Sequence, residues 1–289
     1  MSDESIRIHW FPGHMNKTLR EISDMQKKVD FVLYVLDSRA PFSCLNPELG
    51  KIVENKPICY CLTKKDLANS VETKKWLAHF SGKNSCAVAV DATKNTCVNE
   101  IVKEIEKLLS DKLARDKNKG IRKIYRGMVV GIPNSGKSTL INTLGGSTKA
   151  KTGDKAGVTK STQWVQMGDY YELLDTPGTL WPKLENQKTA LHLAYIGSVK
   201  DEVVDQGDLA LELVKTLTEI APKLLKERYG LETLDKEPIE IFDDICVSRG
   251  FLLRRGEMDY DRCAKAIIDD FRKCRIGKIT LDLCDKIYK

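Results

Sequence analysis

One nine-residue segment, GIPNSGKST at residues 131–139, constrains the fold of this chain more than any other feature. It matches the phosphate-binding pattern G-x-x-x-x-G-K-[ST] through Gly131, Gly136, Lys137 and Ser138. The apolar GMVV before it predicts a strand, and the segment TLINTL after it predicts a helix whose N-terminus faces the phosphates. Such a loop usually follows the first strand of its domain. The 130 residues that precede it here are too many for a tail and must belong to a fold.

Those preceding residues alternate between strand and helix patterns. Nearly continuous apolar runs predict buried parallel strands, and 3.6-residue apolar periods predict helices. The expected strands are 29–37, 57–66 and 85–93, and the expected helices are 46–56, 73–82 and 98–113. This alternation predicts an α/β fold with an open, mostly parallel sheet. From about residue 187 the helical period dominates, so we expect an α/β domain at 1–183 and a small all-helical domain at 184–289.

Composition narrows the class of protein. No apolar run approaches the ~18 residues of a membrane span, and the first residues lack the pattern of a signal peptide. We therefore expect a cytoplasmic protein without a membrane partner. None of the nine cysteines forms a C-x-x-C pair, which favours reduced thiols. Residues 1–185 hold 29 Lys and Arg against 21 Asp and Glu, a basic excess that suits a phosphate-rich partner or simply a mixed surface.

A second motif, DTPG at 175–178, follows another apolar strand pattern. Asp175 is expected to hold Mg²⁺ through water, together with the Ser138 hydroxyl. The N–H of Gly178 is expected to bond the γ-phosphate, so that the following loop senses hydrolysis. Between the two motifs, the polar segment 152–161 suits a switch loop, and Thr159 is its candidate for closing over Mg²⁺ and the γ-phosphate.

Two short segments upstream of the phosphate loop predict which base is read. TKKD at 63–66 ends a buried strand, and its Asp66 carboxylate would accept the two N–H donors of guanine while the Lys64 stem lies along the ring. DAT at 91–93 ends the next strand, and the Ala92 N–H would donate to guanine O6. Ligands of open α/β sheets bind at this carboxyl edge, so both segments are expected to meet the phosphate loop there.

The motif order is therefore that of a circularly permuted GTPase, with the base readers moved ahead of the phosphate loop. Termini of compact domains often lie close together, so a permutation of this kind preserves the sheet. The expected nucleotide-binding residues are Thr63, Lys64, Asp66, Asp91, Ala92, Thr93, Asn134, Ser135, Gly136, Lys137, Ser138, Thr139, Asp175 and Gly178, with Lys137, Thr159 and Gly178 also acting in hydrolysis and Ser138, Thr159 and Asp175 holding Mg²⁺.

With these motifs in place, the chain resembles the circularly permuted ribosome biogenesis GTPase A (YlqF-type) family over nearly its whole length. The matching segments are WFPGHM (10–15), DSRAP (37–41), TKKD, GIPNSGKST, KTGDKAGVTKSTQW (151–164), DTPGTLWP (175–182) and LRRGEMDYDRCAKAIIDDFR (253–272). The resemblance implies GTP-dependent binding to large ribosomal subunit precursors, both rRNA and ribosomal proteins, and release after hydrolysis. No DNA partner is expected.

The resemblance also implies two further roles. Many GTPases carry a glutamine after D-x-x-G, where this chain has Thr179, and the family instead suggests that His14 acts near the attacking water. The alternative is that His14 only packs beside the turn at residues 12–13. Asn134 implies a potassium site, because related GTPases with PNxGKS use this asparagine to hold a potassium ion, which can supply the positive charge of an arginine finger.

The C-terminal helices carry the candidate rRNA contacts, which are Arg249, Arg254, Arg255, Arg262, Lys265, Arg272, Lys273 and Arg275. Solvated helix faces carry similar charges, so the alternative for each of these residues is an exposed surface charge without an RNA contact. Two competing functions remain at this point: a nucleotide-gated RNA-binding protein whose hydrolysis is incidental, and a P-loop kinase or ATPase in which TKKD and DAT are accidental.

Overall fold

A computed structural model describes residues 14–146, 163–181, 184 and 186–288. The chain forms two compact units, and the division falls between residues 183 and 184. The first unit contains the sheet, and the second is helical and ends at Leu281. Residues 282–288 belong to the sheet unit, although the sequence analysis placed them in the helical domain.

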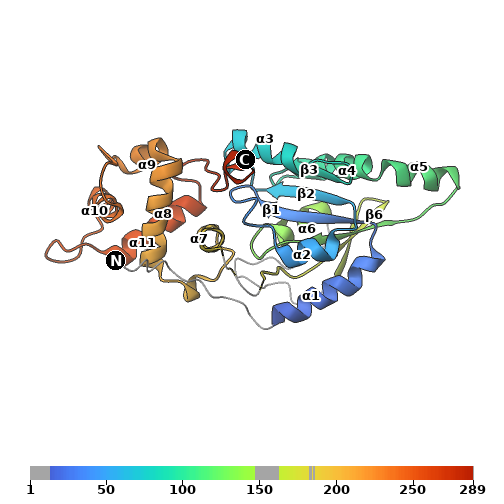
Figure 1. Cartoon of the computed structure of the whole chain (residues 1–289), viewed down its shortest axis with the longest axis horizontal. Helices are drawn as coiled ribbons and strands as arrows, with labels where there is room; N and C mark the ends of the chain where they lie inside the picture. The colour runs from blue at the N-terminus through green and yellow to red at the C-terminus, as the bar shows by residue number, and fades with distance from the viewer. Residues whose placement is uncertain (1–13, 147–162, 182–183, 185, 289) are drawn as a thin grey trace. The chain divides into compact units, whose positions relative to one another are not determined.

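The described part of the sheet unit contains one six-stranded sheet with the order β3-β2-β1-β4-β6-β5. Its strands β3, β2 and β1 lie side by side in Figure 1. Five strands are parallel: β1 (Phe31–Asp37), β2 (Ile58–Thr63), β3 (Ser85–Ala89), β4 (Tyr125–Val130) and β6 (Tyr171–Asp175). The edge strand β5 (Gln163–Met167) runs antiparallel to β6. The strand before the phosphate loop, β4, therefore lies between β1 from the start of the chain and β6.

Helices cover both faces of the sheet. Alternate residues of β1, including Leu33 and Val35, join a buried core with Ile101 of α4 (Thr96–Leu108) and Leu140 of α6 (Lys137–Leu144). On the other face, Tyr34 and Tyr60 pack toward Phe80 of α3 (Ser70–Phe80). There α2 (Pro47–Val53) begins at Asn46, whose side chain accepts from the N–H groups of residues 48 and 49, and α1 (His14–Met25) contacts α2.

In the helical unit, α8 (Gln206–Ile220) packs against α7 (Gln187–Tyr195), α9 (Pro222–Tyr229), α10 (Pro238–Ser248) and α11 (Tyr260–Arg272). Its apolar stripe is buried, as the helical period predicted. The buried carboxylate of Asp270 accepts from Arg228 and Arg275, which joins α9 to α11. The helices in the described ranges include none with the length and apolarity that a bilayer span requires.

The end of the chain returns to the sheet unit through α12 (Cys284–Ile287) and its flanking residues. The Asp282 carboxylate accepts hydrogen bonds from the N–H and the hydroxyl of Ser43 at 2.7 and 3.0 Å. The indole of Trp76 in α3 donates to the Asp282 carbonyl at 2.9 Å. Tyr288 stacks on His79 with a centroid separation of 3.9 Å. The segment 282–288 is therefore an integral part of the sheet unit.

Three elements differ from the sequence expectations. The edge strand β5 and helix α1 were not predicted. The long helix expected from residue 98 divides into α4 and α5 (Ser110–Asn118), with Leu109 outside helical geometry at φ −98° and ψ 9°. All nine cysteines are free, as their spacing indicated.

Replacing Asp282 by alanine should lower the free energy of unfolding by about 1–3 kcal/mol, because it removes the carboxylate that accepts from the buried N–H and hydroxyl of Ser43. Asp285→Ala is the control, since that carboxylate is exposed and water screens its ion pair with Lys75. Urea denaturation of the nucleotide-free protein measures both. Equal midpoints for the two variants would contradict this role of Asp282.

Candidate functional site

The phosphate loop joins β4 to α6, as its motif predicted, and its glycines are required by close contacts. Gly131 has φ +151°, and a Cβ there would lie 2.4 Å from the Val35 carbonyl oxygen. Gly136 has φ +92° at the N-cap of α6, where a Cβ would approach the Thr63 hydroxyl at 3.2 Å. The loop therefore fits closely against β1 and the end of β2. No described side chain caps the N-terminus of α6, and a helix N-terminus favours anions.

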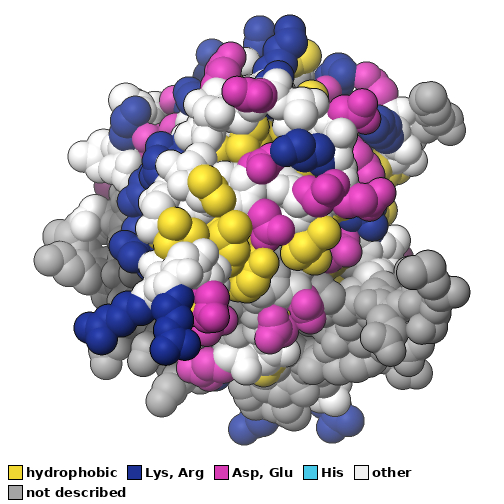
Figure 2. Space-filling view, turned by 90° about the vertical axis from the view of Figure 1, so that its left-hand side faces the viewer, with side chains coloured by type: hydrophobic (Ala, Val, Ile, Leu, Met, Phe, Trp, Pro, Cys, Tyr) yellow, Lys and Arg dark blue, Asp and Glu magenta, His cyan; other side chains and the backbone are white. Residues whose placement is uncertain are grey.

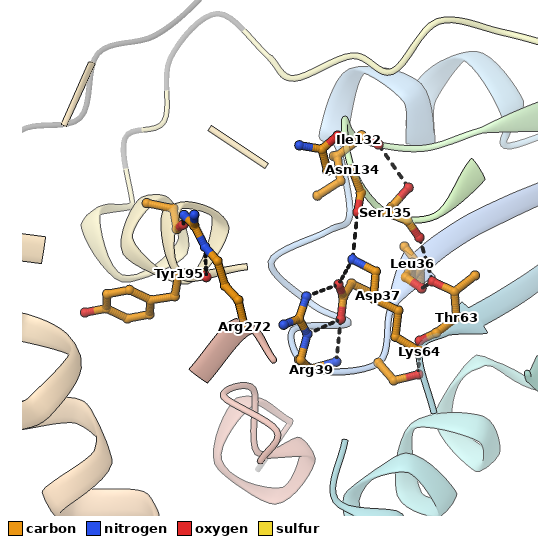
Figure 3. A network of polar contacts seen from close by, with 12 residues as sticks. Leu36, Asp37, Arg39, Thr63, Lys64, Ile132, Asn134, Ser135, Tyr195 and Arg272 are labelled. Carbon is orange, nitrogen blue, oxygen red and sulfur yellow. Dashed lines mark hydrogen bonds and ion pairs between the residues drawn. The ribbon is translucent and has the colours of Figure 1, made fainter. Parts of the chain in front are cut away.

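Two side chains of the TKKD segment hold the phosphate loop from the side (Figure 3). The Thr63 hydroxyl donates to the Ser135 carbonyl at 2.6 Å, and the Lys64 ammonium donates to the Asn134 carbonyl at 2.8 Å. Lys64 and Asn134 both adopt φ +56°, a left-handed backbone that side chains other than glycine rarely adopt. The structure thus brings the expected base reader and the expected phosphate loop together, although 70 residues separate them in sequence.

The DAT segment also lies beside the phosphate-loop helix. The Ala92 carbonyl accepts from Thr143 of α6 at 2.6 Å. Asp91 accepts from the N–H and hydroxyl of Thr93, which forms a compact turn at the carboxyl end of β3. Asp66 follows β2 at the same edge of the sheet, where it is exposed and makes no hydrogen bond with a described residue.

The DTPG segment contacts the phosphate loop from the β6 side. The Thr176 hydroxyl donates to the Val129 carbonyl at 2.6 Å, and the Thr179 N–H donates to the Gly131 carbonyl at 3.2 Å. A Cβ on Gly178 would lie 2.8 Å from the backbone of Pro133 and 2.9 Å from the ammonium nitrogen of Lys137. Only glycine therefore fits here, and its position beside Lys137 agrees with a contact to the same phosphate.

Asp175 and Lys137 are buried opposite charges with few partners. Burial raises the pKa of Asp175 to about 6, and the nearby Lys137 only partly offsets this. Burial lowers the pKa of Lys137 to about 8, against the opposing effect of Asp175. The Lys137 ammonium donates to the Ile132 carbonyl at 2.6 Å, whereas neither oxygen of Asp175 has a hydrogen-bond partner of normal geometry among the described residues.

These residues fit a bound magnesium ion and phosphate. A buried carboxylate without a donor is costly unless a cation approaches it, and Asp175 lies at the carboxyl end of β6 beside the lysine of the phosphate loop. Ser138 follows that lysine on α6 and supplies the hydroxyl that the motif requires. The donor set of carboxylate and hydroxyl oxygens is the kind that Mg²⁺ prefers.

Sequence reasoning missed one further group at this edge, the fully buried Asp37 at the end of β1. Its carboxylate accepts from Arg39 at 3.0 and 2.7 Å and forms an ion pair with Lys64 at 2.8 Å (Figure 3). Burial raises the pKa of Asp37, but the charges of Arg39 and Lys64 outweigh it and hold that pKa well below the ordinary value. The available signal was an acidic residue at the end of an otherwise apolar strand, two positions before an arginine.

Asn46 was missed as well. Its side-chain N–H donates to the Thr179 carbonyl at 3.0 Å, so the start of α2 contacts the loop after DTPG. Two predicted site residues lie outside the described part of the structure: Thr159, and the side chain of His14. Their roles stay predictions.

Comparison with known proteins agrees with this geometry. Residues 126–242 match a family model described as 50S ribosome-binding GTPase. The ribosome biogenesis GTPase A of Bacillus pumilus is 41% identical over 95% of this chain and 98% of its own length. The mitochondrial ribosome-associated GTPase 1 of Ictalurus punctatus is 32% identical over 95% of this chain and 92% of its own.

A solved structure agrees with the fold as well. YlqF from T. maritima, described as GNP-bound, superposes with a TM-score of 0.64 at 25% identity, covering 93% of this chain and 99% of the other. The permuted motif order, the six-stranded sheet and the convergence of the motifs at one edge are thus accompanied by sequence identity over nearly the whole length of the relatives. The chain belongs to the ribosome biogenesis GTPase A family.

Proposed function

We propose that this chain binds large ribosomal subunit precursors in its GTP state, promotes a late assembly step and is released on hydrolysis. Membership of its family makes the chain a GTPase with a role in ribosome assembly. One observation supports the proposal most directly: TKKD and DTPG both contact the phosphate loop, through Lys64 to the Asn134 carbonyl and through Thr179 to the Gly131 carbonyl. In the proposed cycle, parts of a single loop cluster would read both the base and the γ-phosphate.

The helical unit would supply contacts to the particle. Arg272, Lys273 and Arg275 are already paired with Asp201, Asp269 and Asp270, and Arg262 lies over the ring of Phe251. Arg249, Arg254 and Arg255 are exposed and pair with no described residue. Arg254 and Arg255 lie in the turn of a short hairpin closed by the bridge between Leu252 and Met258.

The surface of this unit is mixed in character. Figure 2 shows apolar side chains gathered on one face, with acidic side chains beside them and basic ones toward its margin. Exposed large apolar residues of the unit are Val203, Ile239, Val247, Leu252, Leu253 and Tyr260. A partner that presents both phosphates and protein side chains suits such a surface, which supports a ribosomal particle with rRNA and ribosomal proteins as the partner.

Two catalytic assignments complete the proposal. His14 acts near the attacking water, since Thr179 replaces the usual glutamine, and a loss of hydrolysis with retained GTP binding in His14→Ala would support this role. Asn134 helps to hold a potassium ion, which a comparison of hydrolysis in potassium and sodium salts tests. Asn134 has the left-handed backbone that turns its carbonyl toward Lys64.

Co-sedimentation with large-subunit precursors tests the proposed function. We expect the protein to bind them with a non-hydrolysable GTP analogue and to dissociate with GDP. The double variant Arg254→Glu/Arg255→Glu should reduce the dependence of log K on log salt by about two, one for each lost phosphate contact. Lys200→Glu/Lys223→Glu, with the same change of charge on the same unit, is the control.

Binding that does not respond to nucleotide would contradict the cycle, and a salt dependence unchanged by the arginine variant would contradict the hairpin contact. Turnover measured with and without the precursors separates this cycle from the alternative in which hydrolysis is incidental. Equal turnover in both cases would favour that alternative.

Asp66→Asn should weaken GDP binding at least about tenfold, because the lost bonds to a charged acceptor are worth about 1.5–3 kcal/mol. The same variant should gain affinity for xanthosine diphosphate, since xanthine presents an acceptor where guanine presents a donor. Competition against a fluorescent guanine nucleotide measures both. Asp111→Asn, an exposed substitution at the start of α5, is the control, and an unchanged base preference in Asp66→Asn would exclude Asp66 as the base reader.

Asp175→Asn should change how the stability of the nucleotide-free protein depends on pH. The folded pKa of Asp175 lies near 6, above the ordinary 3.8, so the folded state binds the proton more tightly. The free energy of unfolding should therefore fall as the pH rises from about 4 to about 6, by about 1–3 kcal/mol. The asparagine variant should lose this fall and be more stable than the parent at pH 8.

Thermal unfolding at pH 4.5–8, an interval chosen to span about two units around the pKa, measures this difference. Asp169→Asn, exposed in the turn between β5 and β6, is the matched control and should follow the parent curve. If the stability of Asp175→Asn and of the parent depended on pH in the same way, the raised pKa of Asp175 would be contradicted.

A further inference from the structure

Asp37 is a buried acidic group that the nucleotide cannot reach. It ends β1 and is completely inaccessible to solvent. One oxygen accepts from the N–H and the Nε of Arg39 at 3.0 Å, and the other accepts from Arg39 Nη2 at 2.7 Å and Lys64 Nζ at 2.8 Å. The charged partners of this carboxylate in these contacts are thus Arg39 and Lys64.

Lys64 connects this carboxylate to the site. Its ammonium has two acceptors, the Asp37 carboxylate and the Asn134 carbonyl of the phosphate loop, each at 2.8 Å. About a quarter of its side chain remains exposed. Because the ammonium is already held by two acceptors, the stem is the part that we expect to contact a planar base. In Figure 3 the ammonium lies between Asp37 on one side and the loop carbonyl on the other.

The energetic consequence follows from burial. Charged groups in a low-dielectric environment interact strongly at contact distance, and removing one partner leaves the other desolvated without compensation. Without Asp37, the Lys64 ammonium would keep one of its two acceptors, the neutral Asn134 carbonyl. An ammonium on a flexible four-carbon stem then gains freedom to rotate toward water, and the stem no longer presents a fixed surface.

We propose that Asp37 is a positioning residue for guanine nucleotide recognition, which fixes the Lys64 stem in the place where the base binds. This inference rests on the proposed role of Lys64 at the base. Arg39 has a different part: it balances the charge of the carboxylate, and its hydrogen bonds to Asp37 do not involve the phosphate loop or TKKD.

A merely structural role for Asp37 makes a different prediction. If Asp37 only stabilised the fold, its replacement would lower the unfolding midpoint without a specific effect on GDP affinity. A positioning role requires instead that Asp37 act through Lys64, so that its removal has no further effect once the Lys64 ammonium is absent.

The test compares GDP affinity in a set of variants of the full chain. Asp37→Asn and Lys64→Met should each weaken GDP binding about tenfold, which is the lower end of what the loss of a supporting partner costs at metal sites. The double variant Asp37→Asn/Lys64→Met should bind GDP no more weakly than Lys64→Met alone. Additive losses, or an unchanged affinity in Asp37→Asn, would overturn the proposal.

A second pair of variants keeps the test decisive if Asp37→Asn fails to fold because Arg39 loses its compensating carboxylate. Arg39→Met leaves one carboxylate and one ammonium in balance and should keep its GDP affinity. Asp37→Asn/Arg39→Met differs from it only by the carboxylate and should lose about tenfold. Equal affinities for these two variants would contradict the role of Asp37.

Asp282→Asn is the matched control, because it neutralises another buried carboxylate of the sheet unit that contacts Ser43 and not Lys64. It should lower the unfolding midpoint and leave GDP affinity unchanged. If the parent protein fails to prefer GDP over ADP, or Lys64→Met binds GDP normally, the proposed base site fails. If both behave as expected and Asp37→Asn has no effect, only this inference fails.

Discussion

The hydrogen bonds between TKKD and the phosphate loop are the interactions on which the rest of the site depends. In this permuted chain the two segments belong to different strands and are joined through α3, β3, α4, α5 and β4. The bonds from Thr63 to the Ser135 carbonyl and from Lys64 to the Asn134 carbonyl are what fix them to each other. The Thr63 hydroxyl also lies 3.0 Å from the Leu36 carbonyl, but its single hydrogen serves the nearer acceptor at 2.6 Å. These bonds also provide hydrogen-bond donors for two backbone carbonyls of the phosphate loop, as buried backbone groups require.

Two buried aspartates at the same edge of the sheet show opposite solutions to one electrostatic problem. Asp37 is compensated by Arg39 and Lys64 within the protein, so its charge is permanent and can organise its neighbours. Asp175 lacks such compensation and its pKa rises to about 6 as a result. A charge that the protein does not balance is a charge that a ligand can balance, which is why functional carboxylates so often have perturbed pKa values. Asp37 ends β1 and Asp175 ends β6, the two strands that flank β4 and its phosphate loop. In the proposals made above, Asp37 would support the base and Asp175 would face the metal.

Much of this arrangement could be predicted from the sequence, because local patterns determine it. The apolar runs identified the parallel strands, and the phosphate loop and DTPG were located by residues whose chemistry requires them. The edge strand β5 was missed because three of its five side chains are exposed, so it lacks an apolar run. The pairing of Asp37 with Lys64 and the packing of Asp282 on Ser43 join residues 27 and 239 positions apart. No periodicity or spacing reports such contacts; they depend on which strands become neighbours.

The return of residues 282–288 to the sheet unit changes the topology of the whole chain. Residues 184–281, which form the helical unit as described above, are an insertion between two parts of the sheet unit, residues 11–183 and 282–289. A protease that cleaves one peptide bond inside the insertion therefore cannot separate the two modules, since each fragment keeps a covalent attachment to the nucleotide-binding part. Liberating the insertion as an independent polypeptide requires two scissions, one at each junction.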